Sequence, residues 1–212
     1  MKDVYEQIRK VGILPVIKLN DPGKAAVVGK ALIEGGIPLA EVTFRADGAA
    51  EAIKLMKQEN PDMLIGAGTV LNIKQAEAAI DAGAQFIVAP GFNKEVIKYV
   101  FSRNTPMFPG VVTPSEIEAA IGMGLNIVKF FPAELYGGVA MIKALANPYS
   151  NITFIPTGGI NARNLDKYLS ESKVCACGGS WMVKESLIDN NQFSVITELC
   201  KEAIDIKERV RK

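Results

Sequence analysis

Short apolar runs rich in β-branched and aromatic residues recur along the chain, and longer segments with helical spacing of apolar residues separate them. Such runs are typical of strands buried on both faces, and their alternation with helices indicates a parallel sheet. The pattern predicts a short amphipathic helix at 2–11. It then predicts eight strands, at 12–19, 39–44, 63–70, 86–90, 107–112, from 127, at 153–157 and at 174–178.

A predicted helix follows each strand. Asp21-Pro22 and Thr113-Pro114-Ser115-Glu116 supply an N-cap with proline at the first helical position, and Asn72 and Asn161 are further N-caps. The terminal lysines and arginines are expected to fray. The helices are expected at 22–34, 48–59, 72–83, 93–103, 113–124, about 137–146, from 161 and at 193–208.

Eight strand-then-helix units predict parallel pairing with right-handed crossovers, closed into a (β/α)8 TIM barrel. The alternative is an open doubly wound sheet, which usually needs only five or six strands. No linker rich in proline, glycine or serine interrupts the pattern. We therefore expect a single domain over 1–212 with a short N-terminal helix.

One predicted strand carries a lysine within an almost wholly apolar run, Ile127 to Glu134. Side chains alternate along a strand, so Ile127, Lys129 and Phe131 share one face. Burial disfavours a charged amine, and a neutral amine is a nucleophile towards carbonyl carbon. The alternative is that Lys129 lies at a strand end and extends to solvent.

The second strand alternates polar and apolar residues in Glu41-Val42-Thr43-Phe44-Arg45. Val42 and Phe44 are expected to face the helices, which leaves Glu41, Thr43 and Arg45 on the inner face. Burying these polar groups is costly for a purely structural purpose. The alternative is an internal Glu41–Arg45 ion pair, although the two residues are ~13 Å apart along an extended strand.

Small and polar residues end other strands, and barrel active sites lie at these carboxyl ends. Thr69 follows Gly66-Ala67-Gly68, and Pro90 is placed to shape a pocket wall. Glycine pairs at Gly158-Gly159 and 178–179, the second followed by Ser180, follow the predicted seventh and eighth strands. Barrels often bind phosphate there with free backbone N–H groups, although a single glycine pair is usually only a turn.

The composition excludes several classes of protein. The 212 residues contain no histidine and have a formal net charge of +1. A Ser-His-Asp or Cys-His system and a His-ligated zinc are therefore excluded, and nucleic acid and acidic membranes are not expected partners. Cys175, Cys177 and Cys200 are expected to be reduced core residues. No apolar run is long enough for a membrane span and the N-terminus lacks a signal-peptide core, so we expect a cytoplasmic protein.

The polar residues together suit imine chemistry on a 2-keto acid. Lys129 would condense with the keto carbon, and the iminium would accept electrons as the C3–C4 bond breaks. Glu41 would move the protons. Arg45 and Thr69 would bind the carboxylate, because a guanidinium offers a bidentate fork.

Several motifs in one order also make the chain resemble the bacterial KDPG/KHG aldolases, class I enzymes that act on 2-keto-3-deoxy-6-phosphogluconate (KDPG) and 4-hydroxy-2-oxoglutarate (KHG). The resemblance covers nearly the whole chain. The motifs are GILPVI at 12–17, EVTFR at 41–45, GAGTV at 66–70, APG at 89–91, VKFFPAE at 128–134, PTGGI at 156–160 and GSWM at 179–182.

This resemblance implies roles for individual residues. Lys129 would form the Schiff base and Glu41 would be the general acid/base. Arg45 and Thr69 would hold the pyruvate part. Pro90, Phe131 and Thr157 are further candidate substrate contacts, and Gly158, Gly159 and Ser180 would hold the phosphate. The resemblance also implies a (β/α)8 barrel, a homotrimer, and no metal or other cofactor.

The predicted activity is cleavage of KDPG to pyruvate and glyceraldehyde 3-phosphate, with KHG cleaved to pyruvate and glyoxylate. One alternative is an aldolase for 2-dehydro-3-deoxy-6-phosphogalactonate. Others are a phosphosugar isomerase or epimerase on a similar barrel, and a sugar-phosphate binder without catalysis. Only a Schiff-base aldolase would form a borohydride-trapped pyruvate adduct at Lys129.

Overall fold

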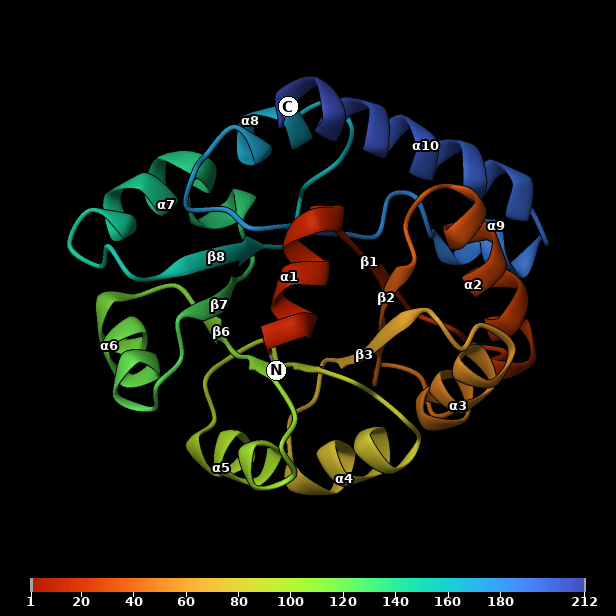
Figure 1. Ribbon diagram of the computed structural model, residues 1–212, viewed down its shortest axis with the longest axis horizontal. Coiled ribbons are helices and arrows are strands. Elements are labelled where there is room, and N and C mark those ends of the chain that lie inside the picture. Colours follow the sequence, from red (N-terminus) through yellow and green to blue (C-terminus); the bar gives the residue numbers. More distant parts are fainter. Residues whose placement is uncertain (1, 212) are drawn as a thin grey trace.

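Parallel strands form two curled sheets with helices packed around them in the computed structural model, which describes residues 2–211 (Figure 1). One sheet has the order β5-β4-β3-β2-β1-β9 and the other β6-β7-β8. All pairings within them are parallel, so the predicted parallel α/β class is confirmed. The strands are β1 Ile13–Ile17, β2 Leu39–Thr43, β3 Leu64–Gly68, β4 Ile87–Val88, β5 Met107–Phe108, β6 Gly110–Val111, β7 Ile127–Phe130, β8 Thr153–Pro156 and β9 Cys177–Gly179.

Three of the predicted caps begin helical segments, and one of them is Asn72, whose Oδ1 accepts a hydrogen bond from Gln75 N at the start of α4. Asp21 Oδ1 accepts a hydrogen bond from Gly23 N, and Thr113 and Glu116 form a reciprocal capping box. The short helix α9 was not predicted from the sequence. The helical segments are α1 Lys2–Val11, η1 Pro22–Lys24, α2 Ala25–Glu34, α3 Ala49–Glu59, α4 Ile73–Asp81, α5 Lys94–Ser102, α6 Pro114–Gly122, η2 Glu134–Tyr136, α7 Gly138–Ala146, α8 Leu165–Leu169, α9 Glu185–Asp189 and α10 Phe193–Val210.

The predicted single strand at 107–112 is wrong, because Pro109 divides it into β5 and β6. Proline has no N–H to give to a ladder. Before Pro109 the chain pairs with β4, and after it with β7, so the two sheets share this segment. On the other side, isolated parallel bridges join Thr157 to Gly178 and Phe154 to Val174.

The predictions for the C-terminal region also need correction. The last strand begins at Cys177 rather than at residue 174, and Arg211 is anchored rather than frayed, while Lys212 lies outside the described residues. The Arg211 guanidinium donates hydrogen bonds to the carbonyl oxygens of Leu169, Val174 and Cys175, at 2.9, 2.6 and 2.8 Å. These bonds hold the segment before β9 against the end of α10.

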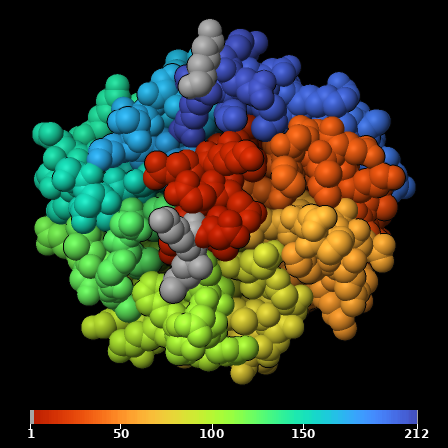
Figure 2. Space-filling model, in the orientation of Figure 1, coloured from red at the N-terminus to blue at the C-terminus, as the bar shows by residue number. Residues whose placement is uncertain are grey.

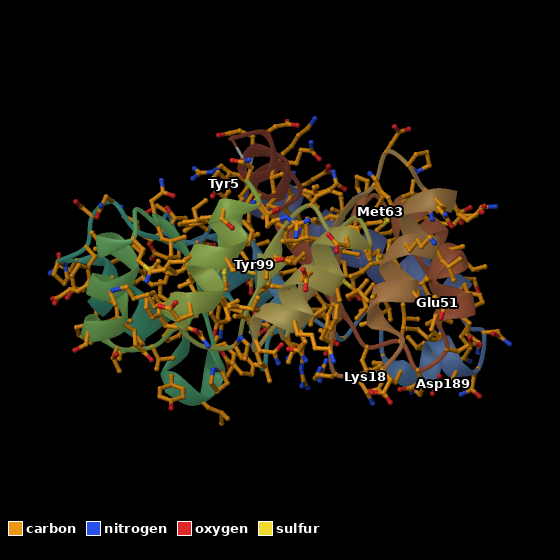
Figure 3. The ribbon with its side chains drawn as sticks, turned by 90° about the horizontal axis from the view of Figure 1, so that it is seen from below. Tyr5, Lys18, Glu51, Met63, Tyr99 and Asp189 are labelled. Atoms are coloured by element: carbon orange, nitrogen blue, oxygen red, sulfur yellow. The ribbon has the colours of Figure 1, made fainter. Side chains whose placement is uncertain are left out.

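The helix α1 covers one end of the strands, in the middle of the face shown in Figure 2. Ile8 is buried, and the Tyr5 ring packs edge-on against Phe108 with centroids 5.6 Å apart. Figure 3 shows Tyr5 at this end, and Lys18, which follows β1, at the opposite end. Because the strands are parallel, their carboxyl ends lie at the end away from α1. No helix within residues 2–211 is long and apolar enough to cross a membrane.

Candidate active site

Lys129 lies in the middle of β7 with its side chain turned inward. The residue is 5% exposed, so it does not extend into solvent. Its Nζ donates to Glu41 Oε1 at 3.4 Å and lies 5.3 Å from the centroid of the Phe131 ring. Lys129 is therefore a buried amine in contact with a carboxylate and an aromatic ring.

Glu41 lies in β2 and is completely buried. Its Oε2 makes no hydrogen bond within the described part of the chain. The carboxyl group fits because Gly68, next to it, lacks a side chain. A Cβ at residue 68 would lie 2.1 Å from Glu41 Oε1. An unpaired buried carboxyl oxygen is costly, so this one is a natural acceptor for a proton or a hydroxyl brought by a ligand.

A pocket of about 290 Å³ opens above this pair at the carboxyl ends of the strands. It brings together every predicted site residue except Glu41, which pairs with Lys129. Gly179, from the second predicted glycine pair, also lines it. Sequence reasoning did not single out Val16 or Ile160, although each lies in one of the motifs. The lining residues are Val16, Arg45, Thr69, Pro90, Lys129, Phe131, Thr157, Gly158, Gly159, Ile160, Gly179 and Ser180.

Arg45 is held at the edge of this pocket by a chain of hydrogen bonds. Its Nε donates to Thr43 Oγ1 at 3.3 Å, and the Thr43 hydroxyl donates to the Ile17 carbonyl at 2.8 Å. Thr43 therefore orients Arg45 rather than facing a ligand. Glu41 pairs with Lys129 and forms no salt bridge with Arg45, so the alternative of an internal Glu41–Arg45 pair is not formed.

Thr69 and Thr157 are the pocket residues with unusual environments. Thr69 has a φ of 57°, a left-handed conformation that costs a β-branched residue on the order of 1–3 kcal/mol. Thr157 is buried, and its Oγ1 has no hydrogen-bond partner within residues 2–211. A Cβ at Gly178 would lie 2.2 Å from this hydroxyl. Thr157 thus offers an unused donor beside the lysine strand.

The turn after β8 is built from two glycines with positive φ, 100° at Gly158 and 83° at Gly159. Asn161 Nδ2 and Asn164 Nδ2 donate to the Gly159 carbonyl, at 3.2 and 3.1 Å. Asn161 is therefore part of the turn, and the prediction that it caps a helix is wrong, because α8 begins only at Leu165. The conformation leaves backbone N–H groups near the pocket, as an anion site requires.

Basic side chains surround the pocket on the β1 side. A neighbouring pocket is lined by Lys18, Arg45 and Lys184, together with Ser180 and Glu185. Lys18 Nζ lies 2.7 Å from Glu185 Oε2, and this bond lowers the pKa of Glu185. The excess of cations over carboxylates at this edge favours an anionic ligand.

The cysteines do not take part in this site. Cys175, Cys177 and Cys200 are buried and free, as predicted for core residues. Burial raises the pKa of Cys175 to about 11 and that of Cys200 to about 12, so both thiols stay protonated at neutral pH. Within residues 2–211 no group of three or more Cys, Asp or Glu side chains is arranged to hold a metal ion.

Comparison with known proteins identifies the relatives of this chain. The family model described as KDPG and KHG aldolase matches residues 4–199. The chain belongs to this family. The resemblance inferred from the motifs is thereby confirmed. Aldolases of this family are carbon–carbon lyases, so the comparison does not favour the alternative of an isomerase or epimerase.

The relatives cover almost the whole chain. The 2-dehydro-3-deoxy-phosphogluconate aldolase of Treponema pallidum (strain Nichols) is 47% identical over 206 residues, 97% of this chain and 98% of the relative. The KHG/KDPG aldolase of Escherichia coli (strain K12) is 39% identical over 205 residues, 96% of each chain. The KDPG aldolase of Legionella pneumophila, solved with pyruvate as a covalent carbinolamine, is 39% identical with a TM-score of 0.91 and covers 94% of this chain and 97% of its own.

Proposed function

We propose that the protein is a class I aldolase that cleaves KDPG to pyruvate and glyceraldehyde 3-phosphate and also cleaves KHG to pyruvate and glyoxylate. The observation that carries the proposal is the buried Lys129 amine, 3.4 Å from the Glu41 carboxylate at the base of the pocket. A covalent carbinolamine of pyruvate in the Legionella pneumophila relative supports the use of an amine.

The cleavage starts when Lys129 Nζ attacks C2 of the keto acid and forms a carbinolamine. Loss of water, with protons moved by Glu41, gives the iminium. Glu41 then takes the proton of the C4 hydroxyl, the C3–C4 bond breaks, and its electron pair moves into the enamine as the aldehyde leaves. Return of a proton to C3 and addition of water release pyruvate and the free amine.

The other pocket residues hold the two charged ends of the substrate. Arg45 and Thr69 bind the C1 carboxylate, where a guanidinium provides two parallel hydrogen bonds. Gly158, Gly159 and Ser180 bind the phosphate through backbone N–H groups and a hydroxyl. Pro90, Phe131 and Thr157 form the walls between these ends.

The fold and assembly that accompany this function are also proposals. We infer that the two sheets are the halves of a closed (β/α)8 barrel, which is supported by the Pro109 junction and by the bridges from β8 to the β9 segment. The iminium provides the electron sink, so the reaction needs no metal or other cofactor. The family resemblance supports a homotrimer in the cytoplasm, formed from one domain per chain.

Borohydride trapping tests the central step. Incubation with pyruvate and borohydride should inactivate the protein and add one reduced pyruvyl group to the peptide that contains Lys129. The variant Lys129→Met, which keeps an unbranched side chain one atom shorter and without the amine, should take up no label. Stable labelling elsewhere, or no label with folded wild-type protein, would contradict the proposal.

The substrate is tested separately by a coupled assay for pyruvate release. KDPG should give the highest kcat/KM, with slower release from KHG. A higher value with 2-dehydro-3-deoxy-6-phosphogalactonate would retain the Schiff-base mechanism but reassign the substrate.

A further inference from the structure

The loop that follows β7, the strand that carries Lys129, is hydrogen-bonded to the glycine turn that follows β8. Beyond the ends of β7 and β8, Ala133 N donates to the Thr157 carbonyl at 2.8 Å and Glu134 N to the Gly158 carbonyl at 3.1 Å. Backbone hydrogen bonding between the two segments thus continues past the ends of both strands. The position of the glycine turn is therefore linked through the backbone to the strand that carries Lys129.

The side chain of Glu134 lies across this turn. A Cβ at Gly159 would lie 2.6 Å from Glu134 Cγ, so the glycine and the glutamate are in direct contact. The Gly159 carbonyl accepts hydrogen bonds from the side-chain amides of Asn161 and Asn164. Two sets of contacts therefore hold the turn in its left-handed conformation, and Glu134 provides one of them.

Glu134 is in turn held by a tyrosine from the core. Tyr168 lies on α8, is 1% exposed, and donates its hydroxyl hydrogen bond to Glu134 Oε1. A Cβ at Gly138 would lie 2.9 Å from this hydroxyl, so the pair fits because residue 138 is glycine. Burial, reinforced by Glu134, raises the pKa of Tyr168, and the hydroxyl stays a donor at neutral pH.

We propose that Tyr168, acting through Glu134, is a positioning residue that holds the Gly158–Gly159 turn in the geometry that receives the substrate phosphate. The inference rests on the proposed function, in which this turn binds the phosphate. Neither Tyr168 nor Glu134 lines the pocket, so their effect passes through the turn and not through contact with the substrate. It follows that the pair affects the binding of phosphorylated substrates and leaves the imine chemistry at Lys129 unchanged.

The variant Tyr168→Phe tests this, because it removes the hydroxyl and keeps the ring in the core. KM for KDPG should rise about tenfold, which corresponds to the loss of one hydrogen-bonded constraint. The inhibition constant of inorganic phosphate should rise by a similar factor. Tyr168→Phe is expected to weaken only the uniform binding of the phosphate, which KHG lacks. The kcat and KM for KHG should therefore stay within about twofold of wild type.

Matched variants separate positioning from stability. Glu134→Gln keeps an acceptor for Tyr168 and removes a negative charge near the phosphate, so its KM for KDPG should equal or fall below that of wild type. Glu134→Ala should reproduce Tyr168→Phe, and the double variant should be no worse than either, because both act through one contact. Tyr99→Phe, which removes a surface hydroxyl bound to Arg103, should change nothing.

Two results from the comparison of KDPG with KHG would overturn the proposal. One is a parallel change of KM for KDPG and KHG in Tyr168→Phe, and the other is a lower melting temperature with an unchanged ratio of the two KM values. Failure of wild-type protein to form the pyruvate adduct would instead overturn the proposed function. Phosphate-dependent thermal stabilisation of wild type and Tyr168→Phe measures the positioning effect without any turnover, and equal stabilisation of both would also overturn it.

Discussion

The Lys129 amine lies 3.4 Å from the Glu41 carboxylate, although Lys129 belongs to the three-stranded sheet and Glu41 to the six-stranded one. The residues are 88 positions apart in the sequence, and both are buried. Their contact therefore forms only when the two sheets come together. This arrangement makes the proposed chemistry a property of the complete fold and not of either sheet alone.

Glu41→Gln should remove proton transfer while leaving the shape of the site intact. We expect kcat for KDPG cleavage to fall by about 10²–10⁴, the range typical of a general acid/base. The amide still accepts a hydrogen bond from Lys129, so the pyruvate adduct should form, but more slowly. Steady-state kinetics together with the rate of borohydride trapping measure the two effects.

Glu95→Gln is the matched control for this variant, because Glu95 pairs with Lys98 on the surface of α5. It should retain wild-type kcat. A Glu41→Gln protein that remains folded and cleaves KDPG within about threefold of wild type would rule out Glu41 as the proton carrier.

Gly68→Ala should impair the site by a steric route. The new Cβ would lie 2.1 Å from Glu41 Oε1, so the carboxylate must move relative to Lys129. We expect kcat to fall by at least about tenfold, because misplacement of a catalytic group by an ångström is enough for such a loss. The protein should also lose stability, on the order of 1–3 kcal/mol.

Gly66→Ala, in the same strand as Gly68, provides the comparison, since its Cβ would lie 2.1 Å from the Phe86 ring. This overpacking should destabilise the protein by a similar amount and leave kcat unchanged below the melting temperature. If both variants lose kcat equally, the position of Glu41 is not the cause.

Much of the site followed from strand periodicity. Alternation in β2 placed Glu41 on the inner face, and the apolar run around Lys129 predicted a buried amine. Both side chains are buried as those patterns implied, although their roles in catalysis stay predictions. The contact between them could not be derived, because distance along the sequence contains no information on how two sheets curl towards each other.

Other features depended on single residues whose effects are not periodic. Pro109 divides a segment that was predicted as one strand because the residues on both sides of the proline are apolar. Arg211 was expected to fray because terminal basic residues are usually solvated, yet three carbonyl oxygens near β9 accept its hydrogen bonds. The Tyr168–Glu134 contact likewise joins α8 to η2, two segments that are adjacent only in the folded chain.

Arg211→Ala should lower stability without changing the chemistry. Three hydrogen bonds to backbone carbonyls would be lost, and bonds to a charged donor contribute about 1.5–3 kcal/mol each in favourable cases. Allowing for partial solvation of the carbonyls, we expect unfolding free energy to fall by roughly 2–4 kcal/mol. Urea unfolding measures the change, and kcat for KDPG should be unaffected at 25 °C.

The control is Arg209→Ala, which removes an exposed guanidinium from the last turn of α10, two residues before Arg211. A surface substitution of this kind should change stability by no more than about 0.5 kcal/mol. Equal destabilisation by both variants would show that total charge, and not the three carbonyl contacts, stabilises this end of the chain.

Thr157→Val should separate stability from substrate binding. Its hydroxyl is buried without a partner, so the isosteric valine removes an unsatisfied group and should leave the unfolding free energy unchanged or higher, by up to about 1 kcal/mol. A hydroxyl placed to pair with a substrate is a strong determinant of specificity, so kcat/KM for KDPG should fall by at least about tenfold.

Thr197→Val tests the opposite case, because its buried hydroxyl donates to the Ala31 carbonyl at 3.0 Å, far from the pocket. That variant should lose about 1 kcal/mol of stability and keep its kcat/KM. Melting curves and kinetics on both variants decide the matter. A Thr157→Val protein that is destabilised yet fully active would mean that the hydroxyl has a structural partner, and that substrate selection depends on other residues of the pocket.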